Sequence, residues 1–198
     1  MKYLIMAAGI AVTGAAHAAE TIRPYIGLQY HWTNSDIHSG DVIPGSDLSI
    51  DDKDSGLGIR GGVLQEYHAF DELMGFVGAE LSFVDLGEIT ATGPGFTAST
   101  EADGIDLSLI GATEVAWRNT FAYGRIGLFQ WDATSQSSGA GTSFNDSDSG
   151  TDFVVGFGMM YFFDEIQIRG GFDRYRMEYD SDSVVNVDAW NIGAQLTF

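Results

Sequence analysis

The sequence predicts an all-β fold, an eight-stranded antiparallel up-and-down transmembrane β-barrel that follows a cleaved N-terminal signal peptide. Three observations lead to this prediction. Apolar and polar residues alternate with a period of two in eight separate segments, which is the pattern of a strand with one apolar face. Short and long connections alternate between these segments. The chain also begins with a stretch typical of secreted proteins.

The N-terminal stretch has the three parts of a signal peptide. Lys2 provides a positive start, Leu4 to Val12 form a short apolar run, and Ala16-His17-Ala18 supplies small residues for cleavage. The apolar run is too short to anchor the chain in a bilayer, because a spanning helix needs about 20 residues. We therefore expect residues 1–18 to be a signal peptide and residues 19–198 to form one outer membrane β-barrel domain.

The alternation is clearest at the C-terminus, where Trp190, Ile192, Ala194, Leu196 and Phe198 share one face and polar residues share the other. Seven further segments show the same period of two: residues 26–32, 57–63, 77–83, 105–111, 124–128, 153–161 and 166–172. About 9 to 13 residues per strand suffice to cross a membrane at a tilt. The sequence therefore predicts eight membrane-crossing strands.

The connections between these segments fall into two classes. Residues 66–73, 118–120 and 164–165 form short turns, whereas residues 33–55, 85–104, 132–150 and 180–186 form long polar loops. In transmembrane barrels the short turns face the periplasm and the long loops face outside. The alternation of the two classes predicts an up-and-down topology with long extracellular loops.

A soluble barrel such as a lipocalin also has eight strands, but its larger apolar residues point inward. Here the second face of several strands carries Gly, Gln, Asn, Thr and charged residues instead. Aromatic residues near the strand ends suit the two interfacial girdles of a membrane barrel; they are Tyr30, Trp32, Phe83, Trp117, Phe121, Trp131, Tyr161, Phe163, Trp190 and Phe198. These features favour the membrane barrel.

With this pattern the chain resembles the small eight-stranded outer membrane barrels of Gram-negative bacteria, of the OmpA transmembrane-domain and OmpX type. The resemblance extends from Arg23 to Phe198 and depends on the strand pattern and the C-terminal aromatic residue. It implies a location in the outer membrane of a Gram-negative bacterium, in contact with its lipids and lipopolysaccharide. It also implies insertion by the barrel-assembly machinery, for which Phe198 would be the signal.

Charged residues in the middle of the strands should face the interior, because an Arg facing lipid at the bilayer midplane costs about 2–4 kcal/mol. We expect an interior ion-pair network made of Arg60, Glu80, Glu114, Arg125 and Arg169. The hairpin lengths predict that Arg60 lies opposite Glu80 and that Glu114 lies beside Arg125. Such a network would block or gate the lumen, or it would line the wall without gating.

Arg174 and Arg176 allow two orientations. Strand parity places both side chains outward near the extracellular end, where they would contact the phosphates of lipopolysaccharide. A bulge near Gly170-Gly171 would instead turn them inward. The sequence leaves both alternatives open.

The composition excludes several classes of function. There are 28 Asp or Glu, 9 Lys or Arg and no Cys among the 198 residues, so disulfides and Cys-based metal or catalytic sites are excluded. A formal charge of −19 argues against nucleic acid as a partner. The acidic run at residues 145–152 would attract an extracellular ligand or divalent cations such as Ca²⁺, but it does not match an EF-hand. We therefore expect no cofactor and no defined metal site.

These features give three hypotheses for function. The first is a non-enzymatic outer membrane barrel with a role in envelope integrity or surface interaction through its long acidic extracellular loops. The alternative is a narrow, gated, porin-like channel for small solutes. The second alternative is a lipid-modifying enzyme that uses His31 with Ser35 and Asp36. The sequence has no HExxH, GxSxG or nucleotide-binding loop, so we predict no catalytic residues.

Overall fold

The computed structural model describes residues 22–36, 49–69, 73–115, 117–139, 142–179 and 184–198. The expected signal peptide, residues 1–18, lies outside the described residues. The strands are β1 (Ile22–Ser35), β2 (Ser49–Asp51), β3 (Lys53–Ala69), β4 (Leu73–Gly93), β5 (Phe96–Glu114), β6 (Thr120–Gly139), β7 (Thr142–Phe163), β8 (Ile166–Glu178) and β9 (Val184–Thr197). In this part of the chain, no helix has the length and apolar character needed to cross a membrane.

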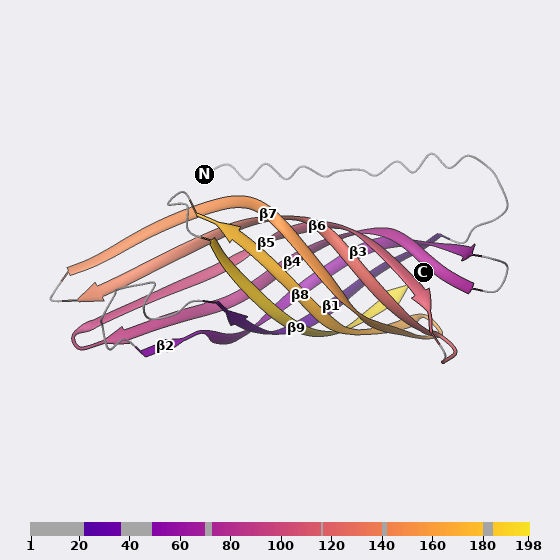
Figure 1. The fold of residues 1–198 in the computed structure, drawn as a ribbon, viewed down its shortest axis with the longest axis horizontal. Coiled ribbons are helices and arrows are strands. Elements are labelled where there is room, and N and C mark those ends of the chain that lie inside the picture. Colours follow the sequence, from indigo (N-terminus) through magenta and orange to yellow (C-terminus); the bar gives the residue numbers. More distant parts are fainter. Residues whose placement is uncertain (1–21, 37–48, 70–72, 116, 140–141, 180–183) are drawn as a thin grey trace.

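Eight of these strands close into a ring, seen from the side in Figure 1. Each pairs antiparallel with its neighbours in the order β1-β3-β4-β5-β6-β7-β8-β9, and β9 returns to β1. The short strand β2 lies outside the ring and pairs with β4. The predicted antiparallel ring of eight strands is thus confirmed.

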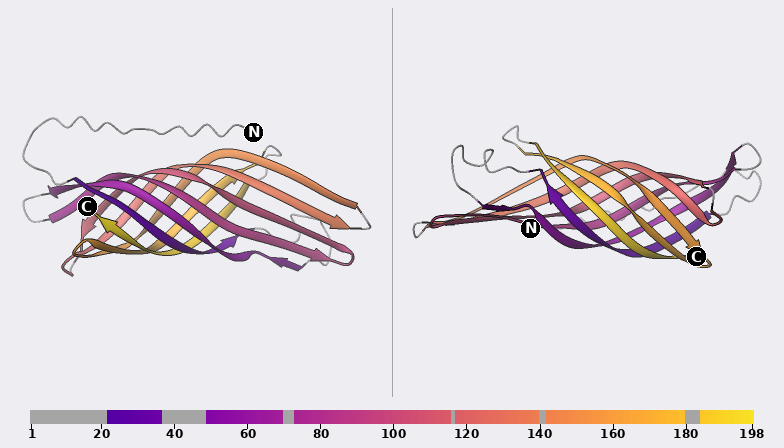
Figure 2. Two further views of the ribbon diagram at one scale, coloured as in Figure 1. Left: turned by 180° about the vertical axis from the view of Figure 1, so that it is seen from behind. Right: turned by 60° about the horizontal axis from the view of Figure 1, so that its bottom comes forward.

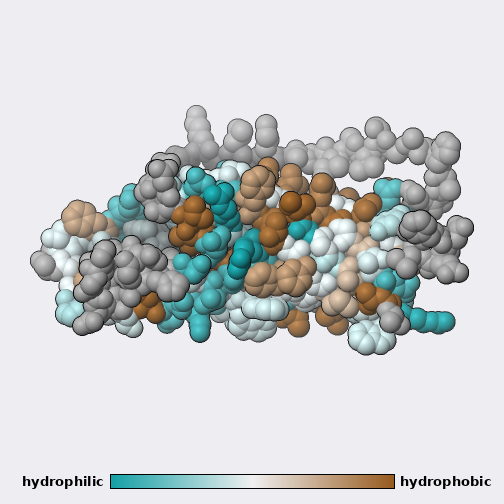
Figure 3. Space-filling view, in the orientation of Figure 1, coloured by the Kyte–Doolittle hydropathy of each residue, from teal (hydrophilic) through white to brown (hydrophobic). Residues whose placement is uncertain are grey.

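The outer surface of the ring is apolar and its interior is polar. On β5 the side chains of Ile105, Leu107 and Leu109 are 51%, 54% and 67% exposed, whereas Asp106 and Ser108 between them are buried. Figure 3 shows apolar side chains gathered over the ring and hydrophilic ones toward the long hairpins. An apolar belt around a polar interior is the arrangement of a membrane barrel.

The strands that were expected to end in long loops continue as paired strand. Pairing of β5 with β6 runs without a break from Glu114↔Phe121 to Phe96↔Gly139, so the loops expected at residues 85–104 and 132–150 are largely absent. Alternating Thr and Ser side chains suit a pleated, half-exposed surface. One irregularity interrupts β4 between Asp85 and Glu88, where Gly87 at φ +81° adopts a conformation that L side chains rarely take.

The β4–β5 and β6–β7 hairpins therefore extend as a sheet beyond the ring (Figure 2). We call this part the protruding sheet, residues 88–101, 133–139 and 142–152. The short turns at the other end join β3 to β4, β5 to β6 and β7 to β8. Following the arrangement of transmembrane barrels, we refer to the end with the short turns as periplasmic and to the other as extracellular.

Candidate functional site

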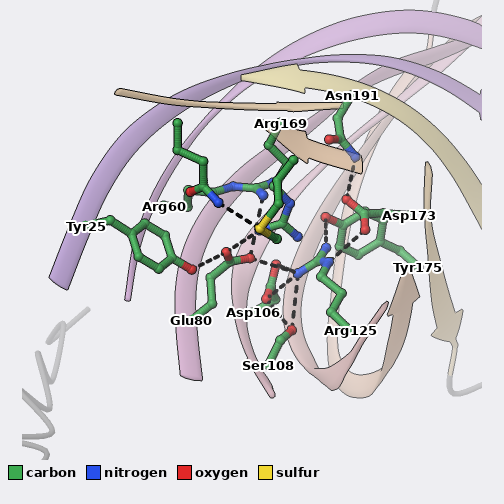
Figure 4. Close-up of polar contacts among 12 residues, drawn as sticks. Tyr25, Arg60, Glu80, Asp106, Ser108, Arg125, Arg169, Asp173, Tyr175 and Asn191 are labelled. Carbon is green, nitrogen blue, oxygen red and sulfur yellow. Dashed lines mark hydrogen bonds and ion pairs between the residues drawn. The ribbon is translucent and has the colours of Figure 1, made fainter. Parts of the chain in front are cut away.

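The middle of the barrel interior is an ionic layer centred on Arg125 of β6 (Figure 4). Its Nε donates to Asp173 of β8 at 2.7 Å, and its Nη1 donates to Asp106 of β5 at 2.9 Å. Nη2 donates to the hydroxyl of Tyr175 at 3.0 Å. Asp173 also accepts a hydrogen bond of 2.7 Å from Asn191. Arg125 is therefore a buried cation with a complete set of partners.

Glu80 of β4 holds the rest of the layer together. Its carboxylate accepts from the hydroxyl of Tyr25 at 2.5 Å and from Nη1 of Arg169 at 2.6 Å. It also forms longer ion pairs with Arg60 at 3.7 Å and with Arg125 at 3.6 Å. The side chain of Glu80 is not exposed to solvent. One buried carboxylate thus balances charge from three guanidinium groups.

Four of the five residues expected in the interior network lie in this layer, but Glu114 does not. The register places Glu114 opposite Phe121, whereas the hairpin length predicted a position beside Arg125, which lies opposite Ile110. The hairpin of β5 and β6 is centred between Trp117 and Arg118 and not on Asn119, the middle of the expected turn, and this shifts the register by about three residues. Glu114 consequently lies at the periplasmic end of β5.

The prediction missed Asp106 and Asp173, the two carboxylates that balance Arg125. Strand parity contains the signal for both. Ile105 and Leu107 face lipid, so Asp106 between them faces inward, and Asp173 follows the lipid-facing Phe172 in the same way. Arg60 is opposite Ser82 rather than opposite Glu80, yet the long side chains still meet.

An apolar layer closes the interior on the periplasmic side. Phe76, Phe121 and Phe162 pack around one another with ring centroids 4.9 to 5.5 Å apart. The guanidinium of Arg23 lies 5.4 Å from the centroid of Phe76 and forms an ion pair of 3.1 Å with Glu66. This aromatic layer separates the ionic layer from the periplasmic mouth.

A second apolar layer lies on the extracellular side of the ionic layer. Phe129 and Tyr175 pack with their ring centroids 4.8 Å apart. Trp131 is fully buried and donates from its indole Nε1 to Asp152 at 2.9 Å. Phe121 and Trp131 were expected in the interfacial girdles, but their strand parity places both inside the barrel.

Arg174 and Arg176 face outward at the extracellular end. The pairing of β8 with both neighbours has no bulge, so Gly170-Gly171 does not reverse the parity. Arg174 forms a two-point hydrogen bond with Asp188 of β9, at 2.6 and 2.7 Å, and this bond raises the pKa of the guanidinium. Arg176 donates to Glu178 at 2.7 Å. Both cations already have carboxylate partners.

Three carboxylates lie side by side on the outer surface above the apolar belt. Asp103 of β5 is directly opposite Asp85 of β4 and Asp132 of β6. Partial burial, together with repulsion from Asp132 and Asp85, raises the pKa of Asp103. In the described part of the chain, no group of three or more His, Asp or Glu side chains is arranged to hold a metal ion.

The structure also places His31 and Phe198, two further residues for which the sequence suggested a role. His31 is fully buried on the inner face of β1, so its ring is not accessible to lipid at the outer rim. Phe198 is 75% exposed, and its backbone N–H donates to the carbonyl of Pro24 at 2.9 Å. The C-terminal residue thus lies on the outer surface where the ring closes.

Comparison with known proteins agrees with this architecture. The family described as outer membrane protein beta-barrel domain matches residues 4–198. The chain belongs to this family. The outer membrane protein β-barrel described here is therefore a protein of the outer membrane of Gram-negative bacteria, in a membrane lipid environment. No curated protein matches its sequence significantly.

The solved structures that match this chain are distant from it in sequence. Ail of Yersinia pestis, solved with the heparin analogue sucrose octasulfate, has a TM-score of 0.55 and 15% identity over 89% of this chain and 99% of Ail. Neisserial surface protein A has a TM-score of 0.48 and 12% identity over 88% and 97%. The N-terminal barrel of Pseudomonas aeruginosa OprF has a TM-score of 0.43 and 11% identity over 88% and 97%.

Proposed function

We propose that this barrel is a non-enzymatic surface-interaction protein whose protruding sheet binds an extended, basic segment of a partner by strand addition. The observation that carries the proposal is the free edge of β7. This strand pairs with β6 along Thr142–Tyr161, but with β8 only from Val154 onward. Among the described residues, no strand covers the outer edge of residues 142–153. An unpaired edge offers a row of backbone donors and acceptors to another chain.

The charge of the extracellular end supports a basic partner. Lys53, Arg174 and Arg176 are its described cations, and the two Arg have carboxylate partners. Arg176 also lies 4.0 Å from Asp152. The described acidic residues of this end outside the ion pairs include Asp51, Asp52, Asp54, Asp85, Glu88, Glu101, Asp103, Asp132, Asp146 and Asp148. Ail was solved with a sulfated heparin analogue; a polyanion of that kind would be repelled here.

A second copy of the chain is a poor partner for the same edge. Two β7 strands paired antiparallel about Ser147 would place Asp146 opposite Asp148 twice. Like charges directly opposite one another destabilise a strand pair. These carboxylates would instead lie opposite Lys or Arg of a basic strand. The acidic residues on β7 thus favour a heterologous partner.

A defined peptide tests the proposal. A twelve-residue peptide of alternating Lys and Val should bind the refolded barrel, more weakly at higher salt, and should slow amide hydrogen exchange at residues 143–153. The double variant Asp146→Lys/Asp148→Lys should lose this binding. Asp51→Lys/Asp52→Lys, with the same charge change beside the opposite edge, should retain most of it. Peptide binding without slower exchange on β7 would contradict the proposal.

Two further contacts belong to this proposal. Lipopolysaccharide phosphates would contact Arg174 and Arg176 at the level of the lipid headgroups, since both side chains face outward there. Phe198 would be read by the barrel-assembly machinery, and its exposure on the outer surface is compatible with that role. Neither contact requires catalytic chemistry in the chain.

A further inference from the structure

The lipid-facing surface of the ring has a groove in which two neighbouring strands lack side chains. Gly111 of β5 and Gly124 of β6 are directly opposite one another. A Cβ added to Gly111 would meet no atom within 4 Å, and one added to Gly124 would meet only a carbonyl oxygen at 4.0 Å. The resulting hollow has a volume of about 510 Å³.

Larger side chains form the walls of this groove. Val77 of β4 is opposite Gly111, and Phe157 of β7 is opposite Gly124; both are exposed on the outer surface. Leu109 and Ile126 line the end nearer the middle of the membrane. Adjacent strands are about 4.8 Å apart, so a floor two strands wide has room for an acyl chain.

Between the groove and the periplasmic end of the ring lies the turn that joins β5 to β6. The next outward-facing pair, Thr113 opposite Ala122, is also small. The turn is fixed by a hydrogen bond of 3.1 Å from the Thr120 N–H to the Trp117 carbonyl. Trp117 is 71% exposed, and exposed Trp residues are typical of the membrane interface.

Arg118 lies in the same turn, beside Trp117. It is exposed, and no carboxylate among the described residues forms an ion pair with it. Gly124 is four positions along β6 from Thr120, about 14 Å along a strand and about 10 Å along the membrane normal at a tilt of about 45°. This depth is about a third of the roughly 30 Å hydrocarbon core. The groove therefore lies at the depth of acyl chains and Arg118 at the depth of headgroups.

We propose that the groove and the turn bind one phospholipid of the periplasmic leaflet, with an acyl chain over Gly111 and Gly124 and the phosphate on Arg118. A guanidinium matches a phosphate with two parallel hydrogen bonds. A second copy of the chain suits the surface less well. A two-fold contact brings identical patches together, and would place hollow against hollow and Arg118 near its own copy.

Native mass spectrometry of the chain refolded in detergent tests this site with two probes. These are dioleoyl phosphatidylglycerol and dioleoylglycerol, which lacks the phosphate. Gly124→Leu should weaken binding of both probes at least tenfold, because the new side chain occupies the groove. Arg118→Gln should weaken binding of the phospholipid at least fivefold and leave dioleoylglycerol unchanged.

Gly170→Leu is the matched control, since Gly170 also faces outward and an added Cβ would meet only the Asn191 carbonyl at 3.7 Å. It should bind both probes as the wild type does. Gly111→Leu provides a second test of the groove if Gly124→Leu does not fold. Equal binding by the groove variants and the control would overturn the proposal. An equal loss of binding of both probes in Arg118→Gln would also overturn it. The same holds if the wild type forms a dimer that excludes lipid and Gly124→Leu dissociates that dimer.

Discussion

Glu80 and Arg169 join opposite walls of the barrel through a hydrogen bond of 2.6 Å. Their strands, β4 and β8, are four positions apart in the ring of eight, so the bond spans the lumen. The same carboxylate accepts from Tyr25 of β1. Within the ionic layer, the bonds of Glu80 to Arg169 and to Tyr25, and of Arg125 to Asp173, are therefore struts between strands that do not pair with one another.

Removing the charge of Glu80 should strongly destabilise the barrel. Glu80→Gln keeps the volume of the side chain but leaves Arg169 and Arg60 without a buried counter-charge, which costs about 3–5 kcal/mol. Urea unfolding in lipid vesicles measures the loss in the free energy of unfolding. Glu66→Gln is the control, because its pair with Arg23 is partly exposed and should contribute at most about 1 kcal/mol. Equal losses in the two variants would contradict the role of the struts.

Breaking the ionic layer alone should not open a channel. Apolar layers lie on both sides of it, with Phe76, Phe121 and Phe162 toward the periplasm and Phe129 and Trp131 toward the outside. Glu80→Ala should therefore give no steady conductance steps in a planar bilayer when it is folded. Steady channels from this single variant would instead identify the ion pairs as the gate.

The row of carboxylates at Asp103 should make stability depend on pH. The raised pKa of Asp103 means that the folded state holds its proton more tightly than the unfolded state does. The contribution of Asp103 to stability is thus most favourable below its unfolded pKa of about 4, and this contribution is lost as pH rises through the raised folded pKa.

Asp103→Asn removes the repulsion from Asp85 and Asp132, so it should raise Tm at pH 7 by about 1–3 °C and have little effect at pH 3. Thermal unfolding in detergent measures this difference. Asp51→Asn is the control, because Asp51 faces Thr90 rather than a carboxylate. An equal gain in Tm at pH 3 and at pH 7 would exclude a titrating carboxylate as the cause.

Lipopolysaccharide binding should increase when Asp188 is neutralised. Asp188 occupies the two donors through which Arg174 would otherwise contact a phosphate. Asp188→Asn should therefore increase the lipopolysaccharide retained by the refolded barrel about tenfold, by about 1.4 kcal/mol, and Arg174→Gln should reduce it. Asp146→Asn, which removes the same charge from the protruding sheet, should change little. No difference between Asp188→Asn and wild type would exclude Arg174 from phosphate binding.

The number of strands in the ring, their order and the face on which each side chain lies could be predicted from the sequence, because a period of two is present in every membrane-crossing segment. That parity also places Arg60, Glu80, Arg125 and Arg169 inside. Residues such as Glu114 could not be placed, since partners depend on register, and register depends on turn geometry that residue types do not determine. The protruding sheet was mistaken for loops because its Ser and Thr residues are polar on both faces, which removes the apolar signal of a strand.

The interior bonds also bear on the order in which the barrel folds. Tyr25, Glu80 and Arg169 come from the first, third and seventh strands of the ring, and Phe198 meets Pro24 only at the final seam. A sheet that has not yet curled shut cannot bring these groups together, so its arginines would face hydrocarbon or trapped water. Intermediates in which β1 and β9 are not yet paired are therefore high in free energy. Closure of the β1–β9 seam is then the cooperative step of assembly.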